Sequence, residues 1–257
     1  MLPFPQVDPE IVRVGPLSVR WYGVMYLLGF AASYLLVKYQ VRKKGVPLAK
    51  DTIESLYSYL ILGLLVGARL GYVLFYNLFH YLHHPLEIFA VWEGGMSFHG
   101  GLIGSILAGI VFCKRFGVGF WRLSDLVIVT TPIGLALGRL GNFINGELYG
   151  RITDVPWGMV FPSGGPLPRH PSQLYEAFLE GVVLFTILWL AKDRVRKPGT
   201  LTALFLMLYG SFRFAVEFFR EPDAHLGFVA GPFSMGQLLS TAMALTGLML
   251  LAWRRRA

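Results

Sequence analysis

The chain has 257 residues, of which 54% are hydrophobic and only 15% are charged, and its mean hydropathy is +0.55. This composition excludes a soluble globular domain of that length and indicates an integral membrane protein. The formal net charge of +8 would suit a nucleic-acid-binding protein. The basic residues, however, lie in the connections between apolar segments, so we expect no nucleic-acid partner.

Seven apolar segments are long enough to cross a bilayer as helices. They cover residues 18–39, 54–77, 96–114, 124–145, 172–191, 200–219 and 233–253. Because no linker, low-complexity tract or repeat separates them, we predict one integral membrane domain over residues 1–257. The predicted fold is all-α: a polytopic membrane protein built as a bundle of seven transmembrane helices with a small outer (periplasmic) loop region.

The positions of the basic residues predict the orientation. They follow the first, third and fifth segments and end the chain: Lys38, Arg42, Lys43, Lys44, Lys50, Lys114, Arg115, Arg122, Lys192, Arg194, Arg196, Lys197, Arg254, Arg255 and Arg256. The long connection over residues 80–95 has no Lys or Arg. By the positive-inside rule, the N-terminus lies outside and the C-terminus is cytoplasmic.

The polar residues within the segments converge on one depth. Arg139 stands about fifteen residues after the cytoplasmic start of its segment, which lifts it roughly 22 Å into a core about 30 Å thick. The same count places the other polar residues in the outer half: Tyr22, Tyr26, Arg69, His99, Glu176, Glu180, Arg213 and Glu217. A charge at mid-membrane costs about 2.5–3.5 kcal/mol, so such groups face the bundle interior and usually serve function.

Helical spacing groups these residues further. Tyr209, Arg213 and Glu217 stand at i, i+4 and i+8 and share one stripe of a helix, and Gln173, Glu176 and Glu180 share a face of another. Two arginines on different helices would clamp an anion such as the phosphate of a lipid head group in the outer leaflet. The alternative is that Arg139–Glu147 or Arg213–Glu217 is a structural ion pair.

Near the outer end of segment 124–145, Arg139 and Asn142 stand at i and i+3 of the predicted helix. The helix is expected to break around Gly146, which leaves Glu147 and Arg151 at the outer mouth of the site.

Glycines predict where helices approach closely. Gly63, Gly67 and Gly71 repeat at four-residue spacing, as do the pairs Gly100/Gly104 and Gly134/Gly138. His99 is flanked by glycines, and histidine is the type of side chain that most readily accepts a proton near neutral pH, so His99 is a candidate general base, although a single histidine at an interface is often structural. The tract "HYLHH" lacks a carboxylate at ligand spacing, so we expect no metal there. We also expect no cofactor.

The motifs "WYGVMY", "GARLGYVLFYN", "WEGGMSFHGG", "GRLGNFINGELYGR", "RHPSQLYE", "YGSFRFAVEFFREPD" and "SMGQ" occur in that order over nearly the whole chain. With them the sequence closely resembles the bacterial prolipoprotein diacylglyceryl transferase family. The resemblance implies a multi-pass enzyme of the bacterial plasma (inner) membrane whose active site faces the outer leaflet. It implies transfer of the diacylglyceryl group of phosphatidylglycerol to the lipobox cysteine thiol of a prolipoprotein signal peptide, with release of glycerol phosphate. The family's important positions fall on Tyr22, His99, Arg139, Asn142, Glu147, Gly150, Tyr209, Arg213 and Glu217.

On this interpretation the catalytic residues are His99, Arg139, Arg213 and Glu217. The substrate-binding residues are Tyr22, Tyr26, Arg69, Asn142, Asn145, Glu147, Gly150, Arg151 and Tyr209. Tyr209 or Glu147 could replace His99 as the base. Membrane lipids surround the chain, which is expected to act as a monomer.

The sequence is also compatible with two other classes of protein. A transporter of a lipid or organic anion would use the same two arginines, but it would usually show inverted repeats, helices broken at mid-membrane or a polar path to both faces. A scaffolding membrane protein would explain neither the common depth nor the signature.

Overall fold

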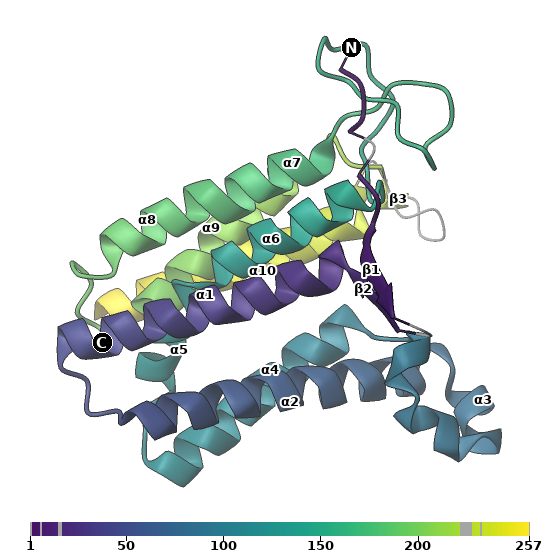
Figure 1. Cartoon of the computed structure of the whole chain (residues 1–257). Coiled ribbons are helices and arrows are strands. Elements are labelled where there is room, and N and C mark those ends of the chain that lie inside the picture. The colour runs from purple at the N-terminus through teal and green to yellow at the C-terminus, as the bar shows by residue number, and fades with distance from the viewer. Residues whose placement is uncertain (1, 6, 15–16, 222–227, 232, 257) are drawn as a thin grey trace. The chain divides into compact units, whose positions relative to one another are not determined.

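Helices make up most of the chain in the computed structural model, which describes residues 2–5, 7–14, 17–221, 228–231 and 233–256 (Figure 1). Packing divides the chain into two units, one formed by residues 1–37 and 124–257 and the other by residues 38–123. Each unit is described by itself. The prediction that residues 1–257 act as a single domain stays a prediction.

The first unit begins with a short antiparallel hairpin. Strands β1 (Glu10–Val14) and β2 (Leu17–Arg20) pair Glu10 with Arg20 and Arg13 with Ser18. Helix α1 (Trp21–Lys44) follows directly. The predicted helical start at residue 18 is therefore wrong, because residues 17–20 continue a strand ladder whose partner lies upstream in the sequence.

The predicted helix 124–145 is two helices. Helices α5 (Phe120–Ile128) and α6 (Thr131–Ile144) meet at an angle of 43°. The break has a local cause: Pro132 lacks an N–H for the preceding turn, and the hydroxyl of Thr130 donates to the carbonyl of Val127 at 2.7 Å. The expected end of the helix is confirmed, since α6 stops at Ile144 and Gly146 has a positive φ of 66°.

The next helix is continuous from Ser172 to Ala191 but changes its winding. It consists of α7 (Ser172–Glu176), the π-helical stretch η3 (Ala177–Val183) and α8 (Leu184–Ala191). A π stretch inside an α-helix is rare and is frequently found at functional sites. Here it carries Glu180.

Helices α9 (Thr200–Val216) and α10 (Met235–Arg256) complete the first unit, with a second small hairpin of β3 (Phe228–Ala230) and β4 (Phe233–Ser234) before α10. Helix α9 ends three residues before the predicted residue 219, because the backbone N–H of Phe219 bonds to the carbonyl of Val216 in a tighter i→i−3 turn. The apolar core at the other end of α9 consists of Val129, Leu184, Leu188, Leu201 and Phe205. There Asp125 accepts the N–H groups of Gly199 and Thr202, so it anchors the start of α9 on α5.

The second unit is a helical hairpin with a lateral arm. Helix α2 (Lys50–Tyr76) packs on α4 (Phe98–Phe116), and the arm between them comprises α3 (Leu78–His83) and the 3₁₀ turns η1 (Pro85–Phe89) and η2 (Val91–Glu93). The predicted close approach at the glycines is confirmed, since a Cβ on Gly67 or Gly71 would lie 2.7 Å from the Cα of Gly104 or Gly100.

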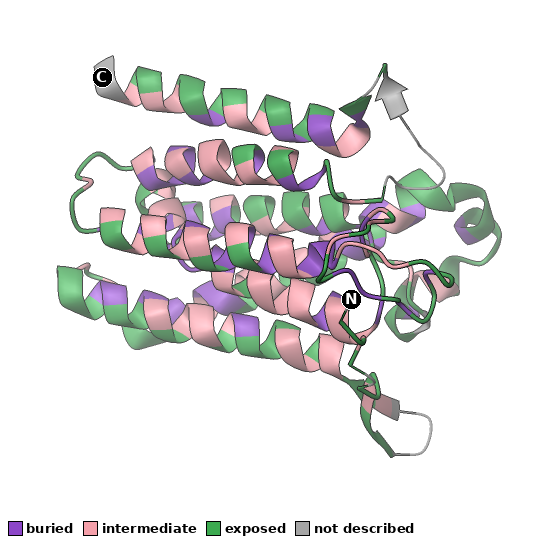
Figure 2. Cartoon of the chain, turned by 90° about the horizontal axis from the view of Figure 1, so that it is seen from above, coloured by how far each residue is buried: buried purple, intermediate pink, exposed green. Residues whose placement is uncertain are grey.

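Four helices are long and apolar enough to cross a membrane within the described residues: Trp21–Lys44, Lys50–Tyr76, Ser172–Ala191 and Met235–Arg254. The bent pair α5–α6 makes a fifth if it is one span, and α9 is a shorter apolar helix. Only 17% to 33% of each apolar stretch is buried, and exposed residues recur along the helices of the first unit (Figure 2). Apolar side chains that face outward are typical of a multi-pass membrane protein.

Candidate active site

The predicted site residues of the first unit gather where α6, the helix Ser172–Ala191 and α9 meet. Gly181 brings the first two helices together, because a Cβ there would collide with the side chain of Ala136. One turn further along α6, the guanidinium Nε of Arg139 lies 2.5 Å from Oε2 of Glu176. A long-range glycine contact thus sets the partner of this arginine.

Arg213 reaches the same carboxylate from α9. Its Nη1 lies 2.9 Å from Glu176 Oε2 and 3.9 Å from Glu180 Oε1, and its Nη2 lies 2.8 Å from Glu217 Oε2. The predicted stripes are confirmed for these pairs, since Arg213 and Glu217 meet at i, i+4 and both Glu176 and Glu180 face one guanidinium.

These five residues form a buried arginine–carboxylate network (Arg139, Glu176, Glu180, Arg213 and Glu217). The three carboxylate side chains are at most 6% exposed, and those of Arg213 and Arg139 are 13% and 20% exposed. Among the residues that the structure describes, neither carboxylate oxygen of Glu180 has a hydrogen-bond partner. Within the described part of the chain, the Nη1 and Nη2 groups of Arg139 also have no hydrogen-bond or ion-pair partner, so they can still donate to a ligand.

Beside this network lies a rim of amides and hydroxyl groups. Glu147 Oε1 accepts hydrogen bonds from Asn142 Nδ2 at 2.9 Å and from Asn145 Nδ2 at 3.1 Å, and its backbone carbonyl accepts one from Gln173. Of the two ion pairs expected in the alternative interpretation, Arg213–Glu217 is present. The pair Arg139–Glu147 is wrong, because Arg139 contacts Glu176 and the carboxylate of Glu147 orients two amides instead.

The two tyrosines of α1 belong to the same rim. The hydroxyl of Tyr22 donates to that of Tyr26 at 3.1 Å. Tyr22 also packs against the backbone of α6, since a Cβ on Gly141 would lie 3.1 Å from its ring, and it lies in the electrostatic field of Glu147 and Arg139. On α9, the ring of Tyr209 stacks on that of Phe205. Tyr209 also interacts electrostatically with Glu180 and Arg213.

Gly150 and Arg151 tie the loop after α6 to the end of α9. The N–H of Gly150 donates to His170, the N–H of Arg151 donates to Phe219, and Arg151 Nε donates to the carbonyl of Arg220 at 2.9 Å. A Cβ on Gly150 would collide with the Phe219 carbonyl oxygen. Only glycine permits this approach, so the immediate role of Gly150 in the structure is steric.

Arg69 and His99 belong to the second unit. Arg69 is 5% exposed, and its guanidinium donates to the carbonyls of Glu87, Ile88, Gly94 and Gly95 at 2.5 to 3.1 Å. These partners are the backbone of the arm. The side chain of His99, in the first turn of α4, is exposed.

Glu176 and Glu180 are the participants that the sequence interpretation leaves without a role. Their common helix face is correctly predicted, since both lie toward Arg213, while their depth in the membrane stays a prediction. Nothing local, however, shows that Glu176 would join two arginines from two other helices, because that depends on how the three helices pack.

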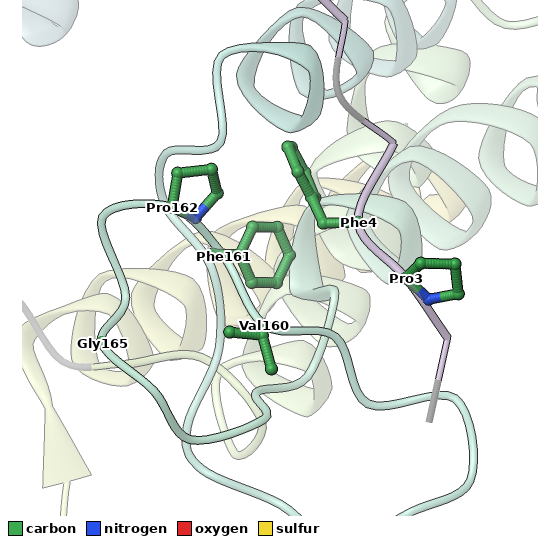
Figure 3. A pocket seen from close by; sticks show the side chains of 6 residues that line it. All are labelled: Pro3, Phe4, Val160, Phe161, Pro162 and Gly165. Atoms are coloured by element: carbon green, nitrogen blue, oxygen red, sulfur yellow. The ribbon is translucent and has the colours of Figure 1, made fainter.

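No group of three or more His, Cys, Asp or Glu residues able to hold a metal ion occurs among the residues that the structure describes. The "HYLHH" tract is instead joined to a carboxylate, with His80 Nε2 2.6 Å from Glu87 Oε2 and His84 Nδ1 3.8 Å from Glu87 Oε1. A hollow of about 420 Å³ lies in the first unit near the N-terminus, lined by Pro3, Phe4, Val160, Phe161, Pro162 and Gly165 (Figure 3). The side chains that line it are apolar, and none of them belongs to a predicted site residue.

Fold and site define a multi-pass membrane protein in which two arginines from different helices share a buried carboxylate. The sequence profile described as prolipoprotein diacylglyceryl transferase matches residues 9–253. The chain belongs to this family, whose members are transferases.

Close relatives cover nearly the full length of both chains and are named phosphatidylglycerol–prolipoprotein diacylglyceryl transferase. The relative from Geobacter sulfurreducens is 57% identical over 245 residues, which are 95% of this chain and 94% of that one. The relative from Bordetella avium is 56% identical over 97% of this chain and 96% of its own length. The relative from Pseudomonas aeruginosa is 51% identical over 100% of this chain and 97% of its own length.

Proposed function

We propose that this protein transfers the diacylglyceryl group of phosphatidylglycerol to the thiol of the lipobox cysteine of a prolipoprotein. The cysteine loses its proton, a bond forms between its sulfur and the terminal glyceryl carbon, and the bond between that carbon and the phosphate oxygen breaks. Glycerol phosphate leaves with the electron pair of the broken bond. The products are a thioether and glycerol phosphate, and this is the first step of lipoprotein maturation.

One observation carries the assignment of the anion site: both guanidinium groups contact the same oxygen, Oε2 of Glu176. The two cations from two helices therefore lie close enough together to hold one further anionic oxygen between them. We assign to a phosphate oxygen of the lipid the place beside this carboxylate, with the unpartnered nitrogens of Arg139 as its first contacts and Arg213 as the second cation. Such donors stabilise the charge that grows on the leaving phosphate.

The rim residues are proposed to hold the rest of the head group. Glu147 orients the amides of Asn142 and Asn145, and the tyrosines Tyr22, Tyr26 and Tyr209 offer hydroxyl groups beside the arginines. Gly150 and Arg151 keep the loop after α6 against α9. Glu217 positions Arg213 through their ion pair. Arg69 donates to backbone carbonyls of the arm, so we propose that its role is to hold the arm in position.

His99 is proposed as the acceptor of the cysteine proton. A thiol has a pKa of about 8.5 and is mostly protonated near neutral pH, yet the thiolate is the nucleophile, so a base is required. The alternative base Glu147 already accepts two amide hydrogens on Oε1. In the purified enzyme, His99→Gln is expected to abolish thioether formation near neutral pH and to recover part of it at higher pH, where the thiol ionises without help. Full activity of this variant at pH 7 would remove His99 as the base.

For the topology we propose seven spans, in which the helix α4, the bent pair α5–α6 and the short helix α9 join the four long apolar helices. The N-terminus lies outside, the C-terminus is cytoplasmic, and the site faces the outer leaflet of the bacterial plasma membrane. The protein acts as a monomer. The break between α5 and α6 is one feature expected of a transporter, but membership of a transferase family favours covalent transfer.

The test uses the detergent-solubilised protein, phosphatidylglycerol and a lipobox peptide, with the products followed by mass spectrometry. We expect the mass of one diacylglyceryl group on the peptide cysteine and an equal amount of glycerol phosphate. A peptide with serine in place of the cysteine is the control and should gain no mass. If phosphatidylglycerol binds but the peptide stays unmodified, the transferase assignment fails and binding or transport is favoured.

A further inference from the structure

The start of α10 is closed by a reciprocal pair of side-chain bonds. Ser234 Oγ accepts the backbone N–H of Gln237 at 3.2 Å, and Gln237 Oε1 accepts the backbone N–H of Ser234 at 3.0 Å. This is a capping box, in which the residue before the helix and the third residue within it satisfy each other's free N–H groups. Both side chains are buried, so the position of the Ser234 hydroxyl is determined on two sides.

The same hydroxyl reaches into the arginine–carboxylate network. A hydroxyl has one hydrogen to donate, and that of Ser234 goes to Glu217 Oε1 at 3.1 Å. Glu217 has its other oxygen on Arg213 Nη2 at 2.8 Å. Each oxygen of the Glu217 carboxylate thus has its own partner. One is Ser234 at the start of α10, and the other is Arg213 on α9.

Gly236 makes room for this arrangement. A Cβ at this position would lie 2.5 Å from Glu217 Oε1 and 2.8 Å from Oε2. The carboxylate therefore lies directly on the first turn of α10, where the free N–H groups and the helix dipole favour negative charge. Glycine in a first helical turn is otherwise unfavourable relative to alanine, so its place here is explained by the carboxylate.

We propose that Ser234 and Gly236 are positioning residues for the transfer reaction, which orient Arg213 by holding Glu217 against the start of α10. This inference rests on the proposed role of Arg213 at the lipid phosphate. Both residues contact Glu217, and we assign neither of them a contact with the substrate. Their effect passes through one carboxylate, which makes it separable from a general contribution to folding.

Ser240 is a matched control on the same helix. It is a buried serine whose hydroxyl donates to the backbone carbonyl of Gly236 at 2.6 Å and does not contact the network. Ser240→Ala removes a hydroxyl of equal size from the same helix. Gly109→Ala, a helical glycine of α4 whose added methyl would meet only Leu60 at 3.9 Å, is the control for added volume.

The experiment measures kcat and KM for phosphatidylglycerol, together with the thermal midpoint, in the full-length enzyme. Ser234→Ala is expected to lower kcat about tenfold, since it removes a buried hydrogen bond to a charged group, with KM within about twofold. Ser234→Thr keeps the hydroxyl and should recover most of kcat. Gly236→Ala is expected to lower kcat at least as strongly without lowering the thermal midpoint. Both control variants should keep the wild-type kcat.

A double-mutant cycle provides the decisive measurement. In the Glu217→Gln background, Ser234→Ala should have little further effect on kcat, because the hydroxyl acts through that carboxylate. Additive losses, or a wild-type kcat in Ser234→Ala while Glu217→Gln is impaired, would overturn the inference and leave the proposed function standing. Full activity of Glu217→Gln and Arg213→Lys would instead overturn the proposed phosphate site itself.

Discussion

Two buried arginine environments in this protein differ in the kind of oxygen they contact. In the second unit, Arg69 donates to four backbone carbonyls of the arm. In the first unit, Arg139 and Arg213 contact the carboxylates of Glu176, Glu180 and Glu217. From the sequence all three arginines are expected at the same depth, with Arg69 as a substrate-binding residue and Arg139 and Arg213 as catalytic residues.

The difference matters because the two kinds of partner constrain a guanidinium differently. Carbonyl partners are part of the chain, so Arg69 cannot exchange them for a ligand without releasing the arm, and Gly95 leaves no space for any Cβ between Arg69 and Tyr72. Carboxylate partners belong to side chains, so an arginine that contacts them can also donate hydrogen bonds to a second anion. A buried arginine is therefore a candidate for phosphate binding when its partners are charged and a candidate for structure when they are backbone.

The largest expected effect is on catalysis. Arg139→Lys and Arg213→Lys should each lower the rate of thioether formation by about 10²–10³, the usual cost of removing one preorganised donor from a developing anion, because lysine cannot offer two parallel N–H groups. The assay is mass spectrometry of the lipobox peptide. The exposed Arg115 of α4 supplies the control, Arg115→Lys, which should keep the wild-type rate. An undiminished rate in Arg139→Lys would refute the phosphate clamp.

The second effect is on stability. Arg69→Met should lower the free energy of unfolding by about 2–3 kcal/mol, since it leaves buried carbonyls without donors, while activity per folded molecule stays near that of the wild type. Thermal unfolding in detergent and hydrogen exchange of residues 85–95 would measure it. A normal thermal midpoint combined with a raised KM for phosphatidylglycerol would contradict the structural role and restore Arg69 as a substrate-binding residue.

Ligand stabilisation gives a smaller effect. Glycerol phosphate at about ten times its Kd should raise the thermal midpoint of the wild type by roughly 2–4 °C. Arg69→Lys should show the same increase from its own lower midpoint, and Arg139→Lys should show little or none. An equal increase in all three proteins would mean that the anion binds elsewhere.

The smallest effect is a pH dependence that involves neither arginine environment. Burial lowers the pKa of His170, the residue whose carbonyl accepts from Gly150, below its usual value. As the pH falls through about 6.5 the unfolded chain takes up a proton before the folded chain does, so the free energy of unfolding falls until the folded pKa is reached. His170→Gln should flatten this slope between pH 7 and 5.5. A slope identical to that of the wild type would show that His170 contributes nothing to it.

Much of the site follows from local periodicity. The pair Arg213–Glu217 is separated by one helical turn, the face shared by Glu176 and Glu180 needs only helical spacing, and Gly146 ends α6 as its sequence predicts. The partners of Arg139 and Arg69 could not be predicted in this way. Each of these partners lies on another helix or in a loop. The sequence alone is equally compatible with many other carboxylates and carbonyls at the same predicted depth.

By itself, the sequence determined that this is a membrane protein and which family motifs its polar residues carry, and it predicted one depth for these residues, because composition and helical spacing are properties of neighbouring residues. Only the tertiary structure decided that Arg139 meets Glu176 rather than Glu147, that Arg69 holds backbone carbonyls, and that Ser234 and Gly236 enclose the carboxylate of Glu217. The physical reason is that a buried charge takes the partner that packing brings within about 3 Å. Helix contacts such as that of Gly181 on Ala136 bring these partners together, and no spacing along the chain records them.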